Sequence, residues 1–137
     1  MLLKNRRIFL VEDDIANRAI FQMLLERNGA KTAIERWGTD TVPRIQAFMP
    51  VDLIVLDLMF PDDISGFDVF DKIRAETALA NIPILAVSAM DPSIAIPHTQ
   101  AKGFNGFIIK PIEYELFAQQ IVSLLNGEAV WFAGDRS

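Results

Sequence analysis

Apolar residues along this chain alternate between short continuous runs and longer stretches of helical spacing. The runs are rich in Ile, Val, Leu and Phe, and they predict five strands, near residues 7–11, 31–35, 51–57, 82–88 and 106–109. Runs that are continuously apolar, rather than alternating, are typical of strands covered by helices on both sides. The alternation of such runs with helical stretches predicts repeated βα units around a parallel sheet.

The stretches between the strands predict five helices, of which the fourth is the least regular. The others are expected over 14–28, about 40–48, from Gly66 to about Thr77, and from Pro111 to Asn126. Pro92 and Pro97 both fall between the fourth and fifth strands, and a proline inside a helix costs ~3 kcal/mol. The fourth helix is therefore expected to be short, about 97–102.

This order of elements predicts an α/β fold of the flavodoxin-like, doubly wound type. Its five-stranded parallel sheet has the strand order 2-1-3-4-5 and carries five helices, the fourth short or irregular. Residues 1–127 are expected to form one domain and residues 128–137 a C-terminal tail. Trp131 and Phe132 lie outside any strong pattern, so we expect a docked or frayed tail, with pairing to another subunit as the alternative.

Composition narrows the classes of function. The chain has 137 residues, 51% of them hydrophobic, a formal charge of −5 and no cysteine. The negative charge disfavours nucleic-acid binding, which depends on basic residues that neutralise phosphates. No disulfide or thiolate metal site is available. The apolar runs are far shorter than the ~18 residues of a membrane span, so we expect a cytoplasmic protein with no membrane contact.

Polar side chains follow four of the predicted strands. Glu12 and Asp13 follow the first strand, Asp57 ends the third, Ser88 the fourth, and Lys110 follows the fifth. Because parallel strands deliver their carboxyl ends to one edge of an open sheet, these residues are expected to surround one site. The site would hold three carboxylates, one hydroxyl and one amine.

Three carboxylates in one cleft require a counter-charge. Two like charges ~4 Å apart cost on the order of 4 kcal/mol at an effective dielectric constant near 20. Mg²⁺ prefers oxygen ligands and is commonly held by one or two carboxylates plus phosphate oxygens, so the set predicts a magnesium site. The alternative to a metal site is that Asp14 caps the first helix and Glu12 lies in solvent. Capping uses one carboxylate and does not account for three.

The same residues fit phosphoryl transfer. The Asp57 carboxylate is the candidate nucleophile, which would form an aspartyl phosphate. The Lys110 ammonium would neutralise developing charge, and the Ser88 hydroxyl would donate a hydrogen bond to a phosphoryl oxygen. The structural alternatives are a solvated loop position for Lys110 and an ordinary strand-end hydroxyl for Ser88.

On these residues, the sequence from about 6 to 126 resembles the receiver domain of two-component response regulators, the family of the chemotaxis response regulator. The resemblance implies that Asp13 binds the metal directly and Glu12 through water. It further implies a role for each of five other residues. Asp57 would be the phosphoacceptor, the backbone carbonyl of Met59 would bind the metal, Ser88 would be the switch hydroxyl, Phe107 the switch aromatic, and Lys110 the lysine that is invariant in the family. In this family the bond before the proline at position 111 is cis.

Three departures from the family pattern stand out. The loop over residues 59–66 is one residue longer than usual, so we expect a bulge after Asp57. Phe107 replaces the commoner tyrosine and retains a ring that can rotate inward. The alternative is that Phe107 is an ordinary apolar strand residue without a switch role. Pro97 lies where the family has a regular fourth helix.

The resemblance implies a phosphoacceptor switch that promotes only its own phosphorylation and dephosphorylation and is not otherwise an enzyme. Its phosphodonor would be a sensor histidine kinase or a phosphotransfer protein, and its output an unknown downstream protein. We expect a monomer or weak dimer. Met59 and Met90 lie two residues beyond Asp57 and Ser88, where apolar flanks would slow hydrolysis of the phosphoryl group.

Two alternative functions remain. A haloacid-dehalogenase-like phosphatase also uses an aspartate nucleophile and Mg²⁺, but that family requires a second acid two residues later, where this chain has Met59. A pseudo-receiver would bind partners without phosphorylation, and the complete set of acids, Ser88 and Lys110 argues against it. His98, the single histidine, is expected at the surface.

Overall fold

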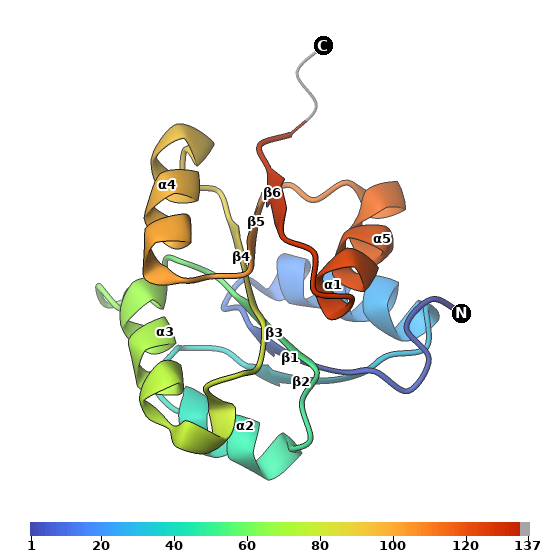
Figure 1. Cartoon of the computed structure of the whole chain (residues 1–137), viewed down its shortest axis with the longest axis horizontal. Helices are drawn as coiled ribbons and strands as arrows, with labels where there is room; N and C mark the ends of the chain where they lie inside the picture. The colour runs from blue at the N-terminus through green and yellow to red at the C-terminus, as the bar shows by residue number, and fades with distance from the viewer. Residues whose placement is uncertain (135–137) are drawn as a thin grey trace.

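A computed structural model describes residues 1–134 as a six-stranded parallel sheet between two layers of helices (Figure 1). The strands are β1 (Arg7–Val11), β2 (Lys31–Glu35), β3 (Leu53–Leu56), β4 (Ile84–Ser88), β5 (Gly106–Ile109) and β6 (Val130–Phe132). The helices are α1 (Ile15–Arg27), α2 (Thr41–Phe48), α3 (Gly66–Ala75), α4 (Pro92–Lys102) and α5 (Tyr114–Leu125), with a 3₁₀ turn at Thr77–Leu79. The first five strands lie where the apolar runs predict them.

The strand order is β2-β1-β3-β4-β5-β6, so the expected order 2-1-3-4-5 is confirmed and extended by one strand. α1 and α5 cover one face of the sheet, and α2, α3 and α4 cover the other (Figure 1). Each face has its own apolar core. Phe21 and Phe117 stack between α1 and α5, with ring centroids 5.5 Å apart. No helix within residues 1–134 is both long and apolar enough to cross a membrane.

The expectation of a short fourth helix is wrong, because α4 runs over all of Pro92–Lys102. Pro92 occupies the first turn, where its missing N–H has no intrahelical partner to lose. Pro97 removes one hydrogen bond, the one its N–H would donate to the carbonyl of Ser93. The loss of one bond bends or weakens a helix but does not end it when the rest is packed. Ala95 and Thr99 of α4 are fully buried.

The start of the last helix also differs from the prediction. α5 begins at Tyr114, with Glu113 as the N-cap residue, so Pro111 precedes the helix instead of opening it. The Lys110–Pro111 peptide bond is cis, as the family resemblance implies. Phe117, Ile121 and Leu124 form the buried stripe of α5.

Part of the expected C-terminal tail is a sixth strand. β6 pairs in parallel with β5 in a register that sets Phe107 beside Trp131 and Ile108 beside Phe132. Trp131 packs against the α4 side of the sheet and Phe132 against the α5 side. Residues 130–132 are therefore docked, and the alternative of a frayed tail is wrong for them. The tail residues 135–137 lie outside the described part of the chain.

Gly106 makes room for this added strand. A Cβ atom at position 106 would lie 2.6 Å from the carbonyl oxygen of Val130. Gly106→Ala should therefore push β6 away and destabilise the full chain by about 1–3 kcal/mol, the usual range for overpacking. Urea unfolding with tryptophan fluorescence measures the change.

A chain ending at Gly127 provides the control, because it lacks the carbonyl of Val130. There, the nearest remaining neighbours of the new methyl are leucine side-chain carbons at 3.1 and 3.2 Å, which can shift. Gly106→Ala should cost clearly less in this shorter chain. An equal cost in both chains would show that β6 does not press on position 106.

Candidate phosphoacceptor site

The acidic residues expected at the strand ends meet at one point. β1 and β3 are neighbours, with Val11 beside Leu56 in the register, and the backbone N–H of Asp57 donates to the carbonyl of Val11 at 3.1 Å. Carboxylate oxygens of Glu12, Asp13 and Asp57 all lie within 4.8 Å of one another. The predicted convergence is confirmed, because adjacent parallel strands end together.

Asp57 is buried and its carboxylate is held on both oxygens. Its side chain accepts hydrogen bonds at Oδ1 from the backbone N–H groups of Leu58 at 2.7 Å and Met59 at 3.3 Å. Its Oδ2 accepts one from Nζ of Lys110 at 2.9 Å. These contacts fix the orientation of the carboxylate at the floor of the cluster.

Lys110 reaches the acid cluster from the end of β5, whereas the acids follow β1 and β3. It follows β5, and its backbone N–H donates to the carbonyl of Ser88 at 2.9 Å, which ties the loop to the end of β4. Its Nζ lies 2.6 Å from Oε1 of Glu12, an ion pair whose angles do not make a regular hydrogen bond. Burial alone would lower the pKa of Lys110, but the carboxylates of Asp57 and Glu12 outweigh burial and raise it. The amine therefore stays charged.

Burial and the neighbouring carboxylate of Asp57 destabilise the charged form of Glu12. Its side chain is almost fully buried, and burial together with repulsion from Asp57 raises its pKa from 4.5 to about 7, although Lys110 opposes the shift. A raised pKa means that the charged form of Glu12 is destabilised in the folded protein. A cation at the cluster would relieve that repulsion.

The shift at Glu12 predicts a pH dependence of stability in chelator-treated protein. Between the unfolded pKa near 4.5 and the folded value of about 7, the folded chain holds a proton that the unfolded chain releases. This contribution is complete below the unfolded pKa and is lost as the pH rises through the folded pKa. The loss should total about 3 kcal/mol, since each pKa unit corresponds to about 1.4 kcal/mol.

Urea unfolding of wild type and Glu12→Gln across this pH range isolates the effect. The difference in free energy of unfolding should change steadily between the two pKa values. Parallel curves for the two proteins would contradict the assigned environment of Glu12.

The residues present fit a divalent cation. When all three acids are ionised, the carboxylates and the Lys110 ammonium leave a formal surplus of two negative charges. All three side-chain donors are oxygen atoms, which are the ligands that Mg²⁺ prefers. The donor set therefore matches the predicted metal in both charge and chemistry.

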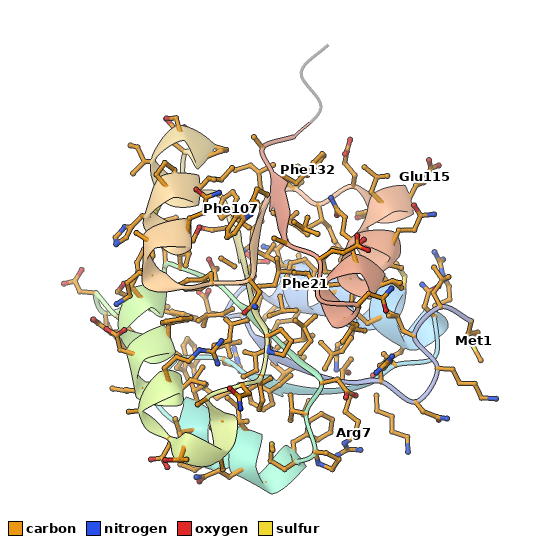
Figure 2. All side chains as sticks on the ribbon, in the orientation of Figure 1. Met1, Arg7, Phe21, Phe107, Glu115 and Phe132 are labelled. Carbon is orange, nitrogen blue, oxygen red and sulfur yellow. The ribbon has the colours of Figure 1, made fainter. Side chains whose placement is uncertain are left out.

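Ser88 and Phe107 lie on the neighbouring strands β4 and β5, and within residues 1–134 the Ser88 side chain makes no hydrogen bond to the three acids. Ser88 is fully buried at the end of β4, and its Oγ accepts a hydrogen bond from the backbone N–H of Met90 at 3.2 Å. Phe107 is also fully buried, on the face of the sheet under α4 (Figure 2). The ring already lies inside the protein, so an inward rotation is not needed to bury it.

Met59 and Met90 line an apolar hollow of about 380 Å³, whose wall also includes Leu58, the residue after Asp57. Met59 is half-exposed, and the rest of the wall comes mainly from the loop that follows β3. In this loop Asp62 and Asp63 both have left-handed backbone conformations, with φ of 60° and 59°. Aspartate tolerates this region better than most residues.

Gly66 lies directly against the residues that follow β3, a close contact that the sequence analysis did not predict. A Cβ atom there would clash with the carbonyl oxygen of Asp57, and the N–H of Gly66 donates to the carbonyl of Leu58 at 2.8 Å. The glycine lets the start of α3 lie directly against Asp57 and Leu58. The sequence marked Gly66 as the start of a helix but did not indicate this close approach.

Comparison with known proteins identifies the family. A family model described as the response regulator receiver domain matches residues 8–122. The polar-differentiation response regulator DivK of Brucella ovis is 29% identical over 121 residues, which cover 88% of this chain and 97% of DivK.

Solved structures agree on the fold. The bacteriophytochrome response regulator RtBRR is 26% identical with a TM-score of 0.70, covering 88% of this chain and 78% of that chain. A response regulator from Chloroflexus aurantiacus has 21% identity and a TM-score of 0.81, covering 90% of this chain and 99% of that chain. The region matched by the family model contains the acid cluster, Ser88 and Lys110. The chain belongs to the response regulator receiver domain family, a family of two-component signalling switches.

Proposed function

We propose that this protein is a signalling switch that receives a phosphoryl group on Asp57. The observation that carries the proposal is the position of the Asp57 carboxylate, which is buried within an acid cluster and held 2.9 Å from the Lys110 ammonium. A buried, oriented carboxylate with a fixed cation beside it is suited to attack phosphorus and to hold the charge of the product.

In the proposed step a carboxylate oxygen of Asp57 forms a bond to the phosphorus of the donor. The bond between that phosphorus and the imidazole nitrogen of the donor breaks, and the nitrogen keeps the electron pair. Lys110 neutralises part of the charge on the transferred group. Ser88 would exchange its contact with the Met90 backbone for a hydrogen bond to a phosphoryl oxygen.

Magnesium is the proposed cofactor, held by Asp13 and Asp57 directly, by Glu12 through water and by the backbone carbonyl of Met59. The receiver domain of a sensor histidine kinase from Pseudomonas aeruginosa, 24% identical to this chain, has a magnesium ion coordinated in its active-site cleft. When bound, the ion would neutralise phosphoryl charge. The surplus of two negative charges in this cluster supports the assignment.

Receiver domains of two-component systems pair with histidine kinases, and we propose a sensor histidine kinase or a phosphotransfer protein as the donor. The output would be a changed affinity for a further protein. Phosphorylation adds about −1.5 to −2 charge beside Ser88, and the strain would pass through β4 and β5 to Phe107 and its neighbour Trp131.

We also propose that Met59 and Met90 slow the loss of the phosphoryl group by keeping water away from it. Both line the apolar hollow whose wall includes Leu58, the residue that follows Asp57 in the chain. A phosphoryl half-life of only seconds would contradict this role.

The test is incubation with acetyl phosphate and Mg²⁺ followed by intact-mass measurement. The proposed function predicts a gain of one phosphoryl group that requires Mg²⁺. An unchanged mass under conditions that phosphorylate another receiver domain would instead favour a pseudo-receiver, which binds partners without phosphorylation.

A further inference from the structure

A second polar pocket lies at the end of β2, next to the acid cluster but built from other residues. It has a volume of about 200 Å³ and lies between the start of α1, the loop after β2 and α2. Three arginines line it, Arg18 from α1, Arg36 from the loop and Arg44 from α2. Trp37, half-exposed, forms part of the wall. Residues far apart in the sequence thus bring three cations to one hollow.

Arg18 is the exceptional member of this group. Its Nε is buried and has no hydrogen-bond partner among residues 1–134. The other two arginines have contacts: Arg44 pairs with Asp40 at 3.3 Å, and the guanidinium of Arg36 lies 4.7 Å from the ring centroid of Trp37. A buried donor without an acceptor costs about 1–3 kcal/mol, more when the group is charged. An acceptor that enters the pocket, either water or an anion, can take this hydrogen bond.

The two acids of the pocket do not meet this need. Glu35 is buried, and its carboxylate already accepts from the backbone N–H groups of Trp37 and Gly38 and from the hydroxyl of Thr41. Asp40 lies at the exposed rim with Arg44. Three arginines and two acids leave a surplus of one positive charge, 3 − 2 = +1. This surplus contrasts with the net charge of −5 on the whole chain.

We propose that this pocket binds the phosphate group of a small phosphomonoester. The guanidinium group is planar and offers donors in a fixed fork that matches phosphate oxygens. The volume of about 200 Å³ is enough for one phosphate group. Trp37 offers a flat apolar surface at the rim for the remainder of the molecule.

The pocket is adjacent to the acid cluster but shares no residue with it. The backbone N–H of Glu12 donates to the carbonyl of Glu35 at 3.1 Å, so the two strand ends are joined by one hydrogen bond. A ligand at Arg18 would bind without Mg²⁺ and without Asp57. The inference therefore does not rest on the proposed phosphorylation.

Fluorescence of Trp37 in a Trp131→Phe background provides the measurement. Inorganic phosphate and adenosine monophosphate are titrated separately in a chelating buffer at constant ionic strength, with chloride as the reference anion. Saturable binding of adenosine monophosphate is expected, with inorganic phosphate equal or weaker. Tighter binding of inorganic phosphate would overturn the assignment of a phosphomonoester.

Variants then locate the site. Arg18→Gln should weaken binding at least tenfold, whereas Arg27→Gln, the same change at an exposed position of α1, should leave it unchanged. Asp57→Asn should also leave it unchanged. Tighter binding in Asp57→Asn, where Lys110 is no longer paired with a charged carboxylate at position 57, would place the anion at Lys110 and overturn the proposal, as would equal affinity in Arg18→Gln and wild type. If Arg18→Gln does not fold, Arg36→Gln serves instead, with a weaker but measurable loss expected and unchanged affinity contradictory.

Discussion

Asp57→Asn is expected to abolish phosphoryl gain from acetyl phosphate while the fold is retained. The asparagine side chain keeps the size and the carbonyl oxygen that can accept from the backbone N–H groups of Leu58 and Met59. It lacks the anionic oxygen that attacks phosphorus, so no covalent product should form. Intact mass after incubation with Mg²⁺ and acetyl phosphate measures the result, and circular dichroism checks the fold.

Asp68→Asn is the matched control, because Asp68 is an exposed residue on α3 outside the acid cluster. It should gain one phosphoryl group as wild type does. A phosphoryl group on the Asp57→Asn protein would show that a different side chain is the acceptor and would refute the assignment.

Lys110→Met should cause the second large effect, on stability and on phosphorylation together. Removal of the ammonium leaves Glu12 and Asp57 buried with no cation beside them, and breaking a buried pair in this way typically costs about 3–5 kcal/mol. The cost should be largest above the pKa of Glu12 and smaller in acid, where a proton neutralises that residue. Denaturant unfolding in chelating buffer at both pH values measures it.

The same variant should gain the phosphoryl group about 10²-fold more slowly. Enzymes lose rate by a similar factor when one group that stabilises the charge of the transition state is removed. Lys102→Met is the control, because Lys102 pairs with the exposed Asp71 at 2.6 Å. Surface pairs contribute about 0–1 kcal/mol, so this change should matter little to either measurement. Equal destabilisation by the two lysine substitutions would contradict the role of Lys110 in the cluster.

The sequence was most informative where one local pattern carried both structure and chemistry. A buried parallel strand requires a continuous apolar run, and the polar residue that follows it marks the carboxyl end of the strand. Glu12, Asp57 and Lys110 could be assigned to one edge of the sheet because all parallel strands end there. The strand order of the first five strands and the convergence of the acids followed from this reasoning.

The errors occurred where tertiary packing outweighed a local rule. Pro97 argued for a broken helix, yet one missing hydrogen bond is tolerated within the packed α4. The three residues of β6 are too few to produce a periodic pattern, and their position depends on the room that Gly106 leaves opposite Val130. Length and propensity alone could not identify that strand.

The arginine pocket escaped detection for a different reason. Its cations come from positions 18, 36 and 44, on three separate elements, and no run of basic residues links them. Only the packing of α1 against the end of β2 brings Arg18 to the other two. The acid cluster, in contrast, is marked by residues that directly follow apolar strands.

Calorimetric titration with Mg²⁺ tests the acid cluster most directly, with wild type, Asp13→Asn and Asp68→Asn compared in metal-free buffer. Asp13 contributes one of the three clustered carboxylates, whereas Asp68 lies outside the cluster. We expect one magnesium ion per chain for wild type and Asp68→Asn, with affinity lowered at least tenfold in Asp13→Asn. No saturable heat and no thermal shift with wild type, or equal affinity in Asp13→Asn, would contradict a shared metal site at the ends of β1 and β3.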